Sequence, residues 1–497
     1  MRSRARASTI PSPMSGIEVT AEAIPGPAAA RRRWLALGVI GIAQLMVVLD
    51  LTVMNIALPS AQRALNFTTA DRQWVVTSYS LAFGSLLLAG GKLGDLVGRR
   101  TTFLVGLVGF AGVSAVGGAS TNFVTLVAAR ACQGVFAAIL VPSALALLIT
   151  SFTDPKDRRR AFGIFGAIAT AGGAIGLLLG GTLTDYLSWR WTLYVNLAFA
   201  AVAFLGGILL LDRQTSHTKF HLDVPGLLLA SGGLFSLVFG FSNAATHSWH
   251  TPLTWGFLAA GGALVVAFAL WIGNAADPLL PPRILLDRNR GGANVAVFVA
   301  SLCLFATLFF LTFYIQRTLN YSPIKTGVAF LPISACLAIA ANLSTVVLMP
   351  RLGPRPVVTT GLLIASGAMA WLAHLGPHTS YGAGVLGPII IAGLGFGMVV
   401  APAINTGTYG VAPQDAGVAS ATVTVSQQLG ASIGTSLLNT IFATAVASYI
   451  TTHRSAATAG ALAHGYDTAF WWTCGIAAGG AIVAALLLRP GPLVGRA

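Results

Sequence analysis

The chain is poor in charged residues. Of its 497 residues only 9% are Asp, Glu, Lys or Arg, whereas 55% are hydrophobic. A soluble globular protein carries about 25% charged residues, because its water-facing surface must be polar. So few charges exclude a large soluble enzyme, and the apolar runs between them are long enough to cross a bilayer.

Other absences narrow the function further. The chain has no G-x-x-x-x-G-K-[ST] phosphate-binding loop, which argues against an ATP-driven pump. Its eight histidines are scattered, which argues against a membrane-embedded metalloenzyme. The four cysteines lie within apolar runs without metal-ligand spacing, so we interpret them as small hydrophobic residues. We therefore expect no enzyme, no metal site and no cofactor.

Apolar stretches of about 20 residues, the length that spans a bilayer, recur fourteen times. The predicted spans are 34–58, 74–90, 101–119, 123–150, 161–184, 191–211, 224–243, 253–273, 292–315, 326–349, 356–375, 382–404, 417–449 and 467–488. The polar stretch before them is predicted to be disordered. The first apolar segment is too long for the core of a cleaved signal peptide, so we expect it to be a retained span.

The basic residues predict the orientation. With the N-terminus in the cytoplasm, most of the 29 lysines and arginines fall in cytoplasmic loops and tails, as the positive-inside rule requires. Arg130 remains inside a span, and the opposite side receives Arg63, Arg72, Arg190, Arg317, Lys325 and Arg454. Both termini are therefore predicted to be cytoplasmic. This placement also explains the net charge of +15 without nucleic-acid binding.

A faint internal repeat indicates two halves. Residues 96–107 and 351–362 align so that Gly98 meets Gly353 and Arg100 meets Arg355. Parallel repeats of six helices are a known transporter plan. We expect an all-α polytopic membrane protein whose parts are a disordered cytoplasmic tail (1–33), a six-helix bundle (34–211), two inserted helices with flanking loops (212–291), a second six-helix bundle (292–489) and a cytoplasmic tail (490–497).

Two charged residues lie well inside predicted spans, Asp50 and Arg130. A charge near the bilayer centre costs at least about 2.5–3.5 kcal/mol, so it is usually functional. From the helix rise, Asp50 lies roughly 24 Å into its span and Arg130 roughly 10 Å from the outer end of its own. Both fall in the outer half of the membrane, where they could interact directly or through Gln133.

The functional interpretation of this pair is a proton relay. A carboxyl group removed from water holds its proton more tightly, and a nearby cation weakens that hold. Moving Arg130 would therefore switch Asp50 between holding and releasing a proton. The alternative is a static ion pair that fixes two helices.

The segment from Gly91 to Arg100 has the pattern G-x-L-x-D-x-x-G-R-R. Its glycines allow a tight turn, and its acidic residue could cap the next helix or pair with an arginine. The pattern resembles the motif A loop of the major facilitator superfamily. The resemblance implies that this loop latches helices on the cytoplasmic side and gates the conformational change, through Gly91, Asp95, Gly98, Arg99 and Arg100.

Other segments strengthen the resemblance, which covers residues 34 to 489. The run from Leu49 to Pro59 is similar to the first-span signature of the fourteen-helix drug:proton antiporter branch. The run from Arg130 to Gly134 resembles motif B, whose arginine is implicated in proton transfer. The tryptophans around Arg190, with Asn196, resemble the branch's entry to span 6. The implied fold is two six-helix bundles plus two inserted helices.

Span 5 carries glycines at four-residue spacing, which lets another helix approach closely. The set, Gly172, Gly176, Gly180 and Gly181, resembles motif C, the antiporter motif. Leu177 stands where that motif usually has a proline, which departs from the pattern. The glycines are therefore interpreted as a packing face that is also antiporter-like.

Polar residues within other spans are candidate cavity residues or interhelical hydrogen-bonding groups. The candidates are Gln44, Asn55, Gln133, Asn342 and Asn405. Some members of the branch carry a second carboxylate in the C-terminal half, associated with dicationic substrates. Span 10 offers only Asn342, which favours neutral or monocationic lipophilic substrates. The aromatic residues Trp74, Tyr79, Phe136 and Phe396 are interpreted as lipid-facing or packing residues rather than as a binding cage.

Together these observations predict a proton-coupled exporter of lipophilic small molecules, working by alternating access as a monomer. It would be driven by the proton gradient in a bacterial cytoplasmic membrane, with no nucleic-acid partner. The bacterial origin is inferred from the excess of arginine over lysine and the abundance of Ala and Gly. The alternatives are a proton symporter that imports a small nutrient, with the same fold, and a channel or receptor.

Overall fold

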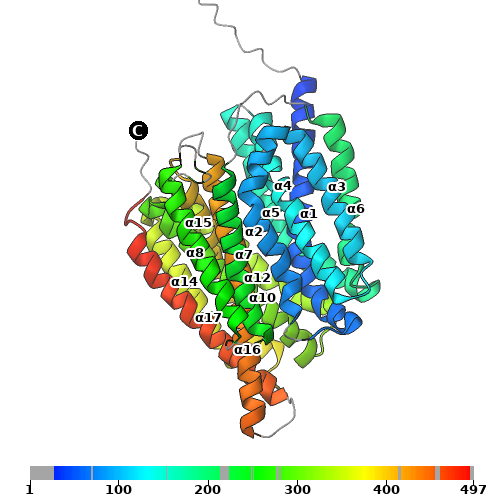
Figure 1. Cartoon of the computed structure of the whole chain (residues 1–497), viewed down its shortest axis with the longest axis vertical. Coiled ribbons are helices and arrows are strands. Elements are labelled where there is room, and N and C mark those ends of the chain that lie inside the picture. Colours follow the sequence, from blue (N-terminus) through cyan, green and yellow to red (C-terminus); the bar gives the residue numbers. More distant parts are fainter. Residues whose placement is uncertain are drawn as a thin grey trace, which may run out of the picture.

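The computed structural model describes most of the chain, namely residues 27–68, 71–152, 154–212, 223–247, 249, 251–275, 278, 280, 282–411, 416–453 and 459–492. In this part every regular element is a helix (Figure 1). Thirteen helical stretches among these residues are long and apolar enough to cross a membrane, and α2 forms a fourteenth rod. The predicted all-α polytopic membrane fold is therefore confirmed.

The first six rods form what we call the N-half. They are α1 (Pro27–Leu65), α2 (Trp74–Val97), α3 (Arg99–Gly118), α4 (Phe123–Ser151), α5 (Pro155–Tyr186) and α6 (Trp191–Leu210), with the short helix η1 (Asp71–Gln73) before α2. Of the predicted disordered tail, residues 1–26 lie outside the described residues, and residues 27–33 form the first turns of α1.

Two rods follow, α7 (Val224–His247) and α8 (Pro252–Asn274), and then the short α9 (Pro282–Leu285). The last six rods form the C-half. They are α10 (Arg288–Phe313) with the π-helical turn η2 (Tyr314–Thr318); α11 (Pro323–Ala329), α12 (Leu331–Leu343), η3 (Ser344–Leu348) and α13 (Met349–Leu352) in one broken rod; α14 (Pro354–Leu372); η4 (Tyr381–Val385) with α15 (Leu386–Thr408); α16 (Ala416–His453); and α17 (Ala459–Leu487).

The buried apolar residues fall into two main clusters. One is built from residues 36–211, and the other is drawn mostly from residues 293–488. The hairpin of α7 and α8 packs through α7 against α2 of the N-half and α16 of the C-half, and lies in front of the bundle in Figure 1. The predicted domain limits stay a prediction, but the hairpin clearly contacts both halves.

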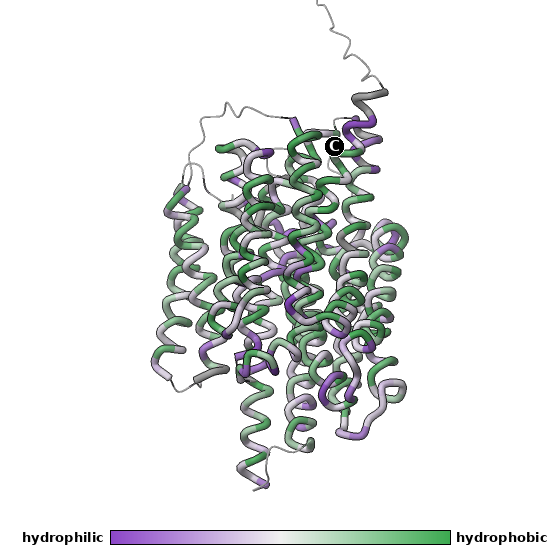
Figure 2. Tube along the Cα trace, turned by 90° about the vertical axis from the view of Figure 1, so that its right-hand side faces the viewer, coloured by the Kyte–Doolittle hydropathy of each residue, from purple (hydrophilic) through white to green (hydrophobic). Residues whose placement is uncertain are grey.

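Helix α1 begins and α17 ends at the same end of the bundle, which we call the terminal end (Figure 1). The opposite end, which contains η1 and the end of α5, we call the far end. Along the rods hydrophobic residues dominate, and hydrophilic residues gather mainly at the ends and at a few points inside (Figure 2). This distribution is what a bilayer requires of a helix bundle.

The predicted loop between the second and third spans is not a loop. Helix α2 continues to Val97 and α3 starts at Arg99, so Gly98 alone joins them. Its φ of 99° is open to glycine but strained for other residues. Gly353, its partner in the internal repeat, joins α13 to α14 with a φ of 81°. Gly98, rather than Asp95, occupies the N-cap of α3, and the side chain of Asp95 lies outside the described residues.

The glycines of α5 bring it close to α1, the helix that carries Asp50. A Cβ atom at Gly176 would lie 1.9 Å from Thr52 Oγ1, and one at Gly180 would lie 2.9 Å from the backbone of Val53. Gly172 faces the side chain of Val48 on the same helix. No methyl group fits between these helices, so the glycine face fixes how closely α1 is held.

We predict that Gly176→Ala destabilises the protein by about 1–3 kcal/mol, because overpacking a tight helix contact forces α1 outward. Gly173→Ala is the matched control, since a Cβ atom there meets nothing within 4 Å. The measurement is the thermal unfolding midpoint in detergent. Equal midpoints for the two variants would contradict the assignment of the glycine face.

Candidate functional site

Asp50 and Arg130 form an ion pair inside the N-half. Arg130 Nη1 lies 2.5 Å from Asp50 Oδ2. Each residue is 1% exposed, so neither charge meets solvent. Asp50 comes from the middle of α1 and Arg130 from the second turn of α4. The two residues were predicted to interact directly or through Gln133. In the structure they contact each other directly, and Gln133 also hydrogen-bonds to both of them.

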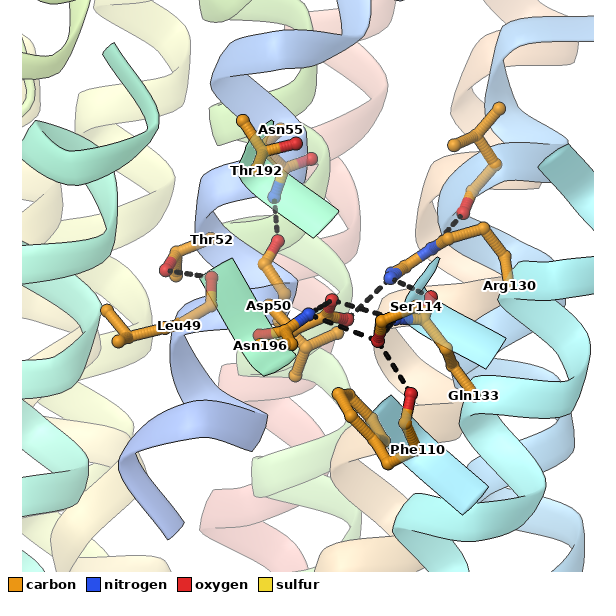
Figure 3. A network of polar contacts seen from close by, with 12 residues as sticks. Leu49, Asp50, Thr52, Asn55, Phe110, Ser114, Arg130, Gln133, Thr192 and Asn196 are labelled. Carbon is orange, nitrogen blue, oxygen red and sulfur yellow. Dashed lines mark hydrogen bonds and ion pairs between the residues drawn. The ribbon is translucent and has the colours of Figure 1, made fainter. Parts of the chain in front are cut away.

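Asp50 Oδ1 accepts two more hydrogen bonds (Figure 3). Gln133 Nε2 donates to it at 3.1 Å and Asn196 Nδ2 at 2.8 Å. Ser114 Oγ accepts from the same two amides, at 2.7 and 3.4 Å, and donates to the carbonyl of Phe110. The carboxylate is therefore bound by side chains from α4 and α6, and α3 supports them.

Arg130 is itself held from three directions. Its Nε donates to the carbonyl oxygen of Val75 in the first turn of α2, at 3.1 Å. Its Nη1 also donates to Gln133 Oε1 at 2.9 Å, and its guanidinium lies over the ring of Tyr79, 4.6 Å from the centroid. A buried guanidinium needs this many partners, because each unsatisfied donor costs free energy.

The spacing within α4 explains how its residues reach the site. Arg130 and Gln133 are three residues apart and so lie on the same helix face. Gly134 follows on that face, and a Cβ atom there would lie 2.3 Å from the carbonyl oxygen of Tyr79 on α2. The glycine thus lets α4 approach α2 closely enough for Arg130 to bind a backbone carbonyl.

The arrangement stabilises the ionised carboxylate, which accepts one charged and two neutral hydrogen bonds. Adding a proton to Asp50 would remove the attraction to Arg130 and weaken the contact that joins α1, α4 and α6. The same residues therefore tie the charge of Asp50 to the packing of α1, α4 and α6. Among the described residues no group of three or more His, Cys, Asp or Glu side chains is placed to bind a metal ion.

The predicted gating segment lies at the terminal end, away from the ion pair. Arg100 donates to the carbonyls of Gly207 and Ile208 in the last turn of α6, at 3.3 and 2.6 Å. The last carbonyls of a helix lack intrahelical partners, and they attract a cation. The contact of Arg100 therefore links α3 to α6 within the N-half.

The candidate cavity residues differ in their surroundings. Gln133 contacts Asp50, whereas Asn55 and Asn342 donate to carbonyls one turn back in their own helices, at 3.2 and 3.1 Å. Gln44 Oε1 is buried and has no hydrogen-bond partner in the described part of the chain. Asn405 is exposed near the terminal end of α15. Their role as cavity residues stays a prediction.

Sequence reasoning did not place three residues at this site: Ser114 was given no role, Tyr79 was interpreted as a lipid-facing or packing residue, and Asn196 was assigned only to the pattern at the entry to span 6. Ser114 and Asn196 could have been found from the sequence, because they lie at nearly the same depth in the membrane as Arg130. Ser114 lies four residues before the end of α3, Asn196 five after the start of α6 and Arg130 seven after the start of α4. At about 1.5 Å per residue, these three lie roughly 6–11 Å from the far end.

Comparisons with known proteins identify the class. Residues 40–435 match the family model of the Major Facilitator Superfamily. A puromycin resistance protein of Streptomyces alboniger is 46% identical over 96% of this chain and 95% of its own length. A cephamycin export protein of Amycolatopsis lactamdurans is 38% identical over 80% and 83%. The chain therefore belongs to the major facilitator superfamily.

The fold agrees with that assignment. The crystal structure of an auto-inhibited POT family peptide transporter superposes with a TM-score of 0.66 at 17% identity, covering 94% of this chain and 98% of the other. The protein is a multi-pass membrane transporter and not an enzyme, as its family and its transporter relatives indicate.

We predict that Arg130→Met destabilises the protein by about 3–5 kcal/mol, because it leaves a carboxylate buried without its counter-ion. The double variant Asp50→Leu/Arg130→Met should be less destabilised than Arg130→Met alone, because no unpaired charge remains. The measurement is the free energy of unfolding by SDS titration. If the two substitutions add, the residues do not act as a pair.

Proposed function

We propose that the protein exports lipophilic, antibiotic-like small molecules in exchange for protons, by alternating access. The observation that carries the proposal is the fully buried carboxylate of Asp50, bound to Arg130 inside the membrane-spanning bundle. An ionisable pair at this depth is expensive and is typical of proton relays in transporters. The names of the relatives support the direction and the substrate class, since they include an export protein and resistance proteins.

In this mechanism the proton and the helix contacts compete. With Asp50 ionised, Arg130 joins α1 to α4 and, through the carbonyl of Val75, to α2. When Asp50 takes up a proton, the ionic attraction is lost and Arg130 keeps only Val75, Gln133 and the ring of Tyr79. The helices of the N-half are then free to shift relative to one another, which permits the change between the two access states.

The basic loops support an orientation with the terminal end in the cytoplasm, since positively charged loops are retained there. The far end then faces outward, and Asp50 receives protons from that side. We propose a bacterial cytoplasmic membrane as the location and a monomer as the working unit. The rival function, an importing symporter, would use the same pair and differs only in the direction of substrate movement.

For the coupling residue we predict that Asp50→Asn lowers proton-driven uptake of puromycin into everted vesicles by about a hundredfold, the scale of losing a proton-transfer group. The measurement uses radiolabelled puromycin and an acid vesicle lumen. Asp185→Asn is the control, because that carboxylate is exposed at the end of α5. Full activity in the Asp50→Asn variant would rule out the relay.

The same vesicles separate the two directions. Under an acid-lumen gradient an exporter of the antiport type accumulates substrate in the lumen. A symporter instead expels substrate that was loaded beforehand. Expulsion would therefore replace the proposed function with nutrient import.

We also predict that the native chain, expressed in a puromycin-sensitive bacterium without its own efflux pumps, raises the inhibitory concentration of puromycin, and that Asp50→Asn at equal expression does not. A rise is expected because export only has to outpace passive re-entry of a lipophilic amine. The measurement is growth inhibition across a dilution series. If the strain that expresses the native chain shows no rise in the inhibitory concentration of puromycin, the substrate belongs to another class.

A further inference from the structure

The sequence places Arg72 between the first two spans, and the structure buries it there. It lies in η1, between α1 and α2 at the far end, and it is only 2% exposed. Its guanidinium projects out of the N-half into the C-half, where it lies over three aromatic rings. The distances from Cζ to the ring centroids are 4.0 Å for Phe313, 4.8 Å for Phe309 and 5.3 Å for Phe442.

This aromatic cage, made of Phe309, Phe313 and Phe442, satisfies the guanidinium only partly. Within the described part of the chain one side-chain hydrogen bond accompanies it, from Arg72 Nη2 to Asn439 Oδ1 at 3.3 Å, and the buried Arg72 Nε has no hydrogen-bond partner there. Burial lowers the pKa of Arg72 to about 10; Tyr466 raises it and Arg317 lowers it to a smaller extent. Arg72 therefore stays charged at neutral pH, in a site where that charge is poorly solvated.

Other contacts across the far end show that the two halves are closed on each other there. Arg317 donates to Gln62 Oε1 at 2.9 Å, and Gln316 donates to the carbonyl of Ile56 at 3.0 Å. A Cβ atom at Gly181 would lie 2.6 Å from the backbone of Ile324. Opening this end would pull Arg72 out of its cage and into water.

Two opposing effects act on Arg72 when the far end closes. The ring faces attract the cation, more strongly where water is excluded. Removing the charge from water with so few hydrogen bonds disfavours the closed state, and an apolar residue of similar size in such a place is often more stable. The closed state is therefore less stable than it would be with an apolar residue in the cage.

We propose that Arg72 is a positioning residue that sets the balance between the closed and open far end, through its partly satisfied burial in a cage supplied by the other half. The proposal deepens the proposed function, because it rests on alternating access between the two ends. It is specific in direction: the charge at Arg72 favours opening, and the aromatic cage favours closure.

The position of Arg72 also connects the cage with the ion pair. Arg72 precedes Val75 by three residues, and the carbonyl of Val75 accepts the hydrogen bond from Arg130. The start of α2 is thus fixed on one side by the proton-binding pair and on the other by the cage. A shift of Arg130 after protonation of Asp50 would reach Arg72 through a single helical turn.

The test measures the far-end distance between the halves directly. Spin labels at Asp185→Cys and His378→Cys report it, since both positions are exposed there, one on each half, in a chain whose four native cysteines are replaced by serine or alanine. Pulsed electron–electron double resonance on the purified protein gives the populations of short and long distances between the two labels. This readout needs neither substrate nor proton gradient, so it can fail independently of the proposed function.

We predict that Arg72→Met lowers the ratio of open to closed populations by about tenfold, because an apolar chain of similar length fills the cage without a charge. Arg190→Met is the matched control. Arg190 is an arginine at the same end, but it bonds the carbonyls of Gly118 and Ser120 and stacks on Trp189 within the N-half. That variant should leave the distance populations unchanged.

A second variant tests the cage from the other half. Phe313→Leu removes the nearest ring and should raise the open population, and the effect should be smaller when Arg72→Met is also present, since the ring then has no cation to attract. Unchanged or more open populations in Arg72→Met would overturn the proposal. So would equal effects of Phe313→Leu with and without the arginine.

Discussion

The ion pair of Asp50 and Arg130 constrains the rest of the N-half. In a bilayer neither charge is tolerated alone, so each must have a partner wherever the helices lie. That requirement fixes the distance between α1 and α4; the donor from Asn196 extends it to α6, and Ser114 extends it to α3. Four helices are thereby organised around one carboxylate, and any change of its charge is felt by all of them.

The glycines of the chain serve that constraint, because side chains can meet only where backbones approach. Gly134 brings α4 against α2, so that Arg130 reaches the carbonyl of Val75. The glycine face of α5 holds α1 at a distance that leaves no room for a methyl group. Leu177, in place of the proline usual in motif C, is buried and its carbonyl lies against Gly327 of the C-half. Close packing therefore does not depend on that proline here.

The cage at Arg72 also holds a buried arginine, here between the two halves. Inside the N-half the arginine at position 130 has a carboxylate partner, and its contact is strong. Between the halves Arg72 meets, among the described residues, ring faces and one amide oxygen, so its contact is weaker. In the proposed alternating-access cycle the second kind of contact breaks and the first kind only rearranges.

The sequence alone determined the membrane class, the number of rods and the identity of the charged pair. Composition, apolar length and the rarity of charge inside a span are local properties, so they can be counted without knowing the fold. The tertiary structure decided which partners meet. Asn196 bonded Asp50, Ser114 bonded the amide of Gln133 beside it, Asn342 bonded its own helix, and the guanidinium of Arg72 reached the rings of the opposite half. These contacts depend on how helices rotate and cross, and packing between distant segments, rather than any local pattern, sets that geometry.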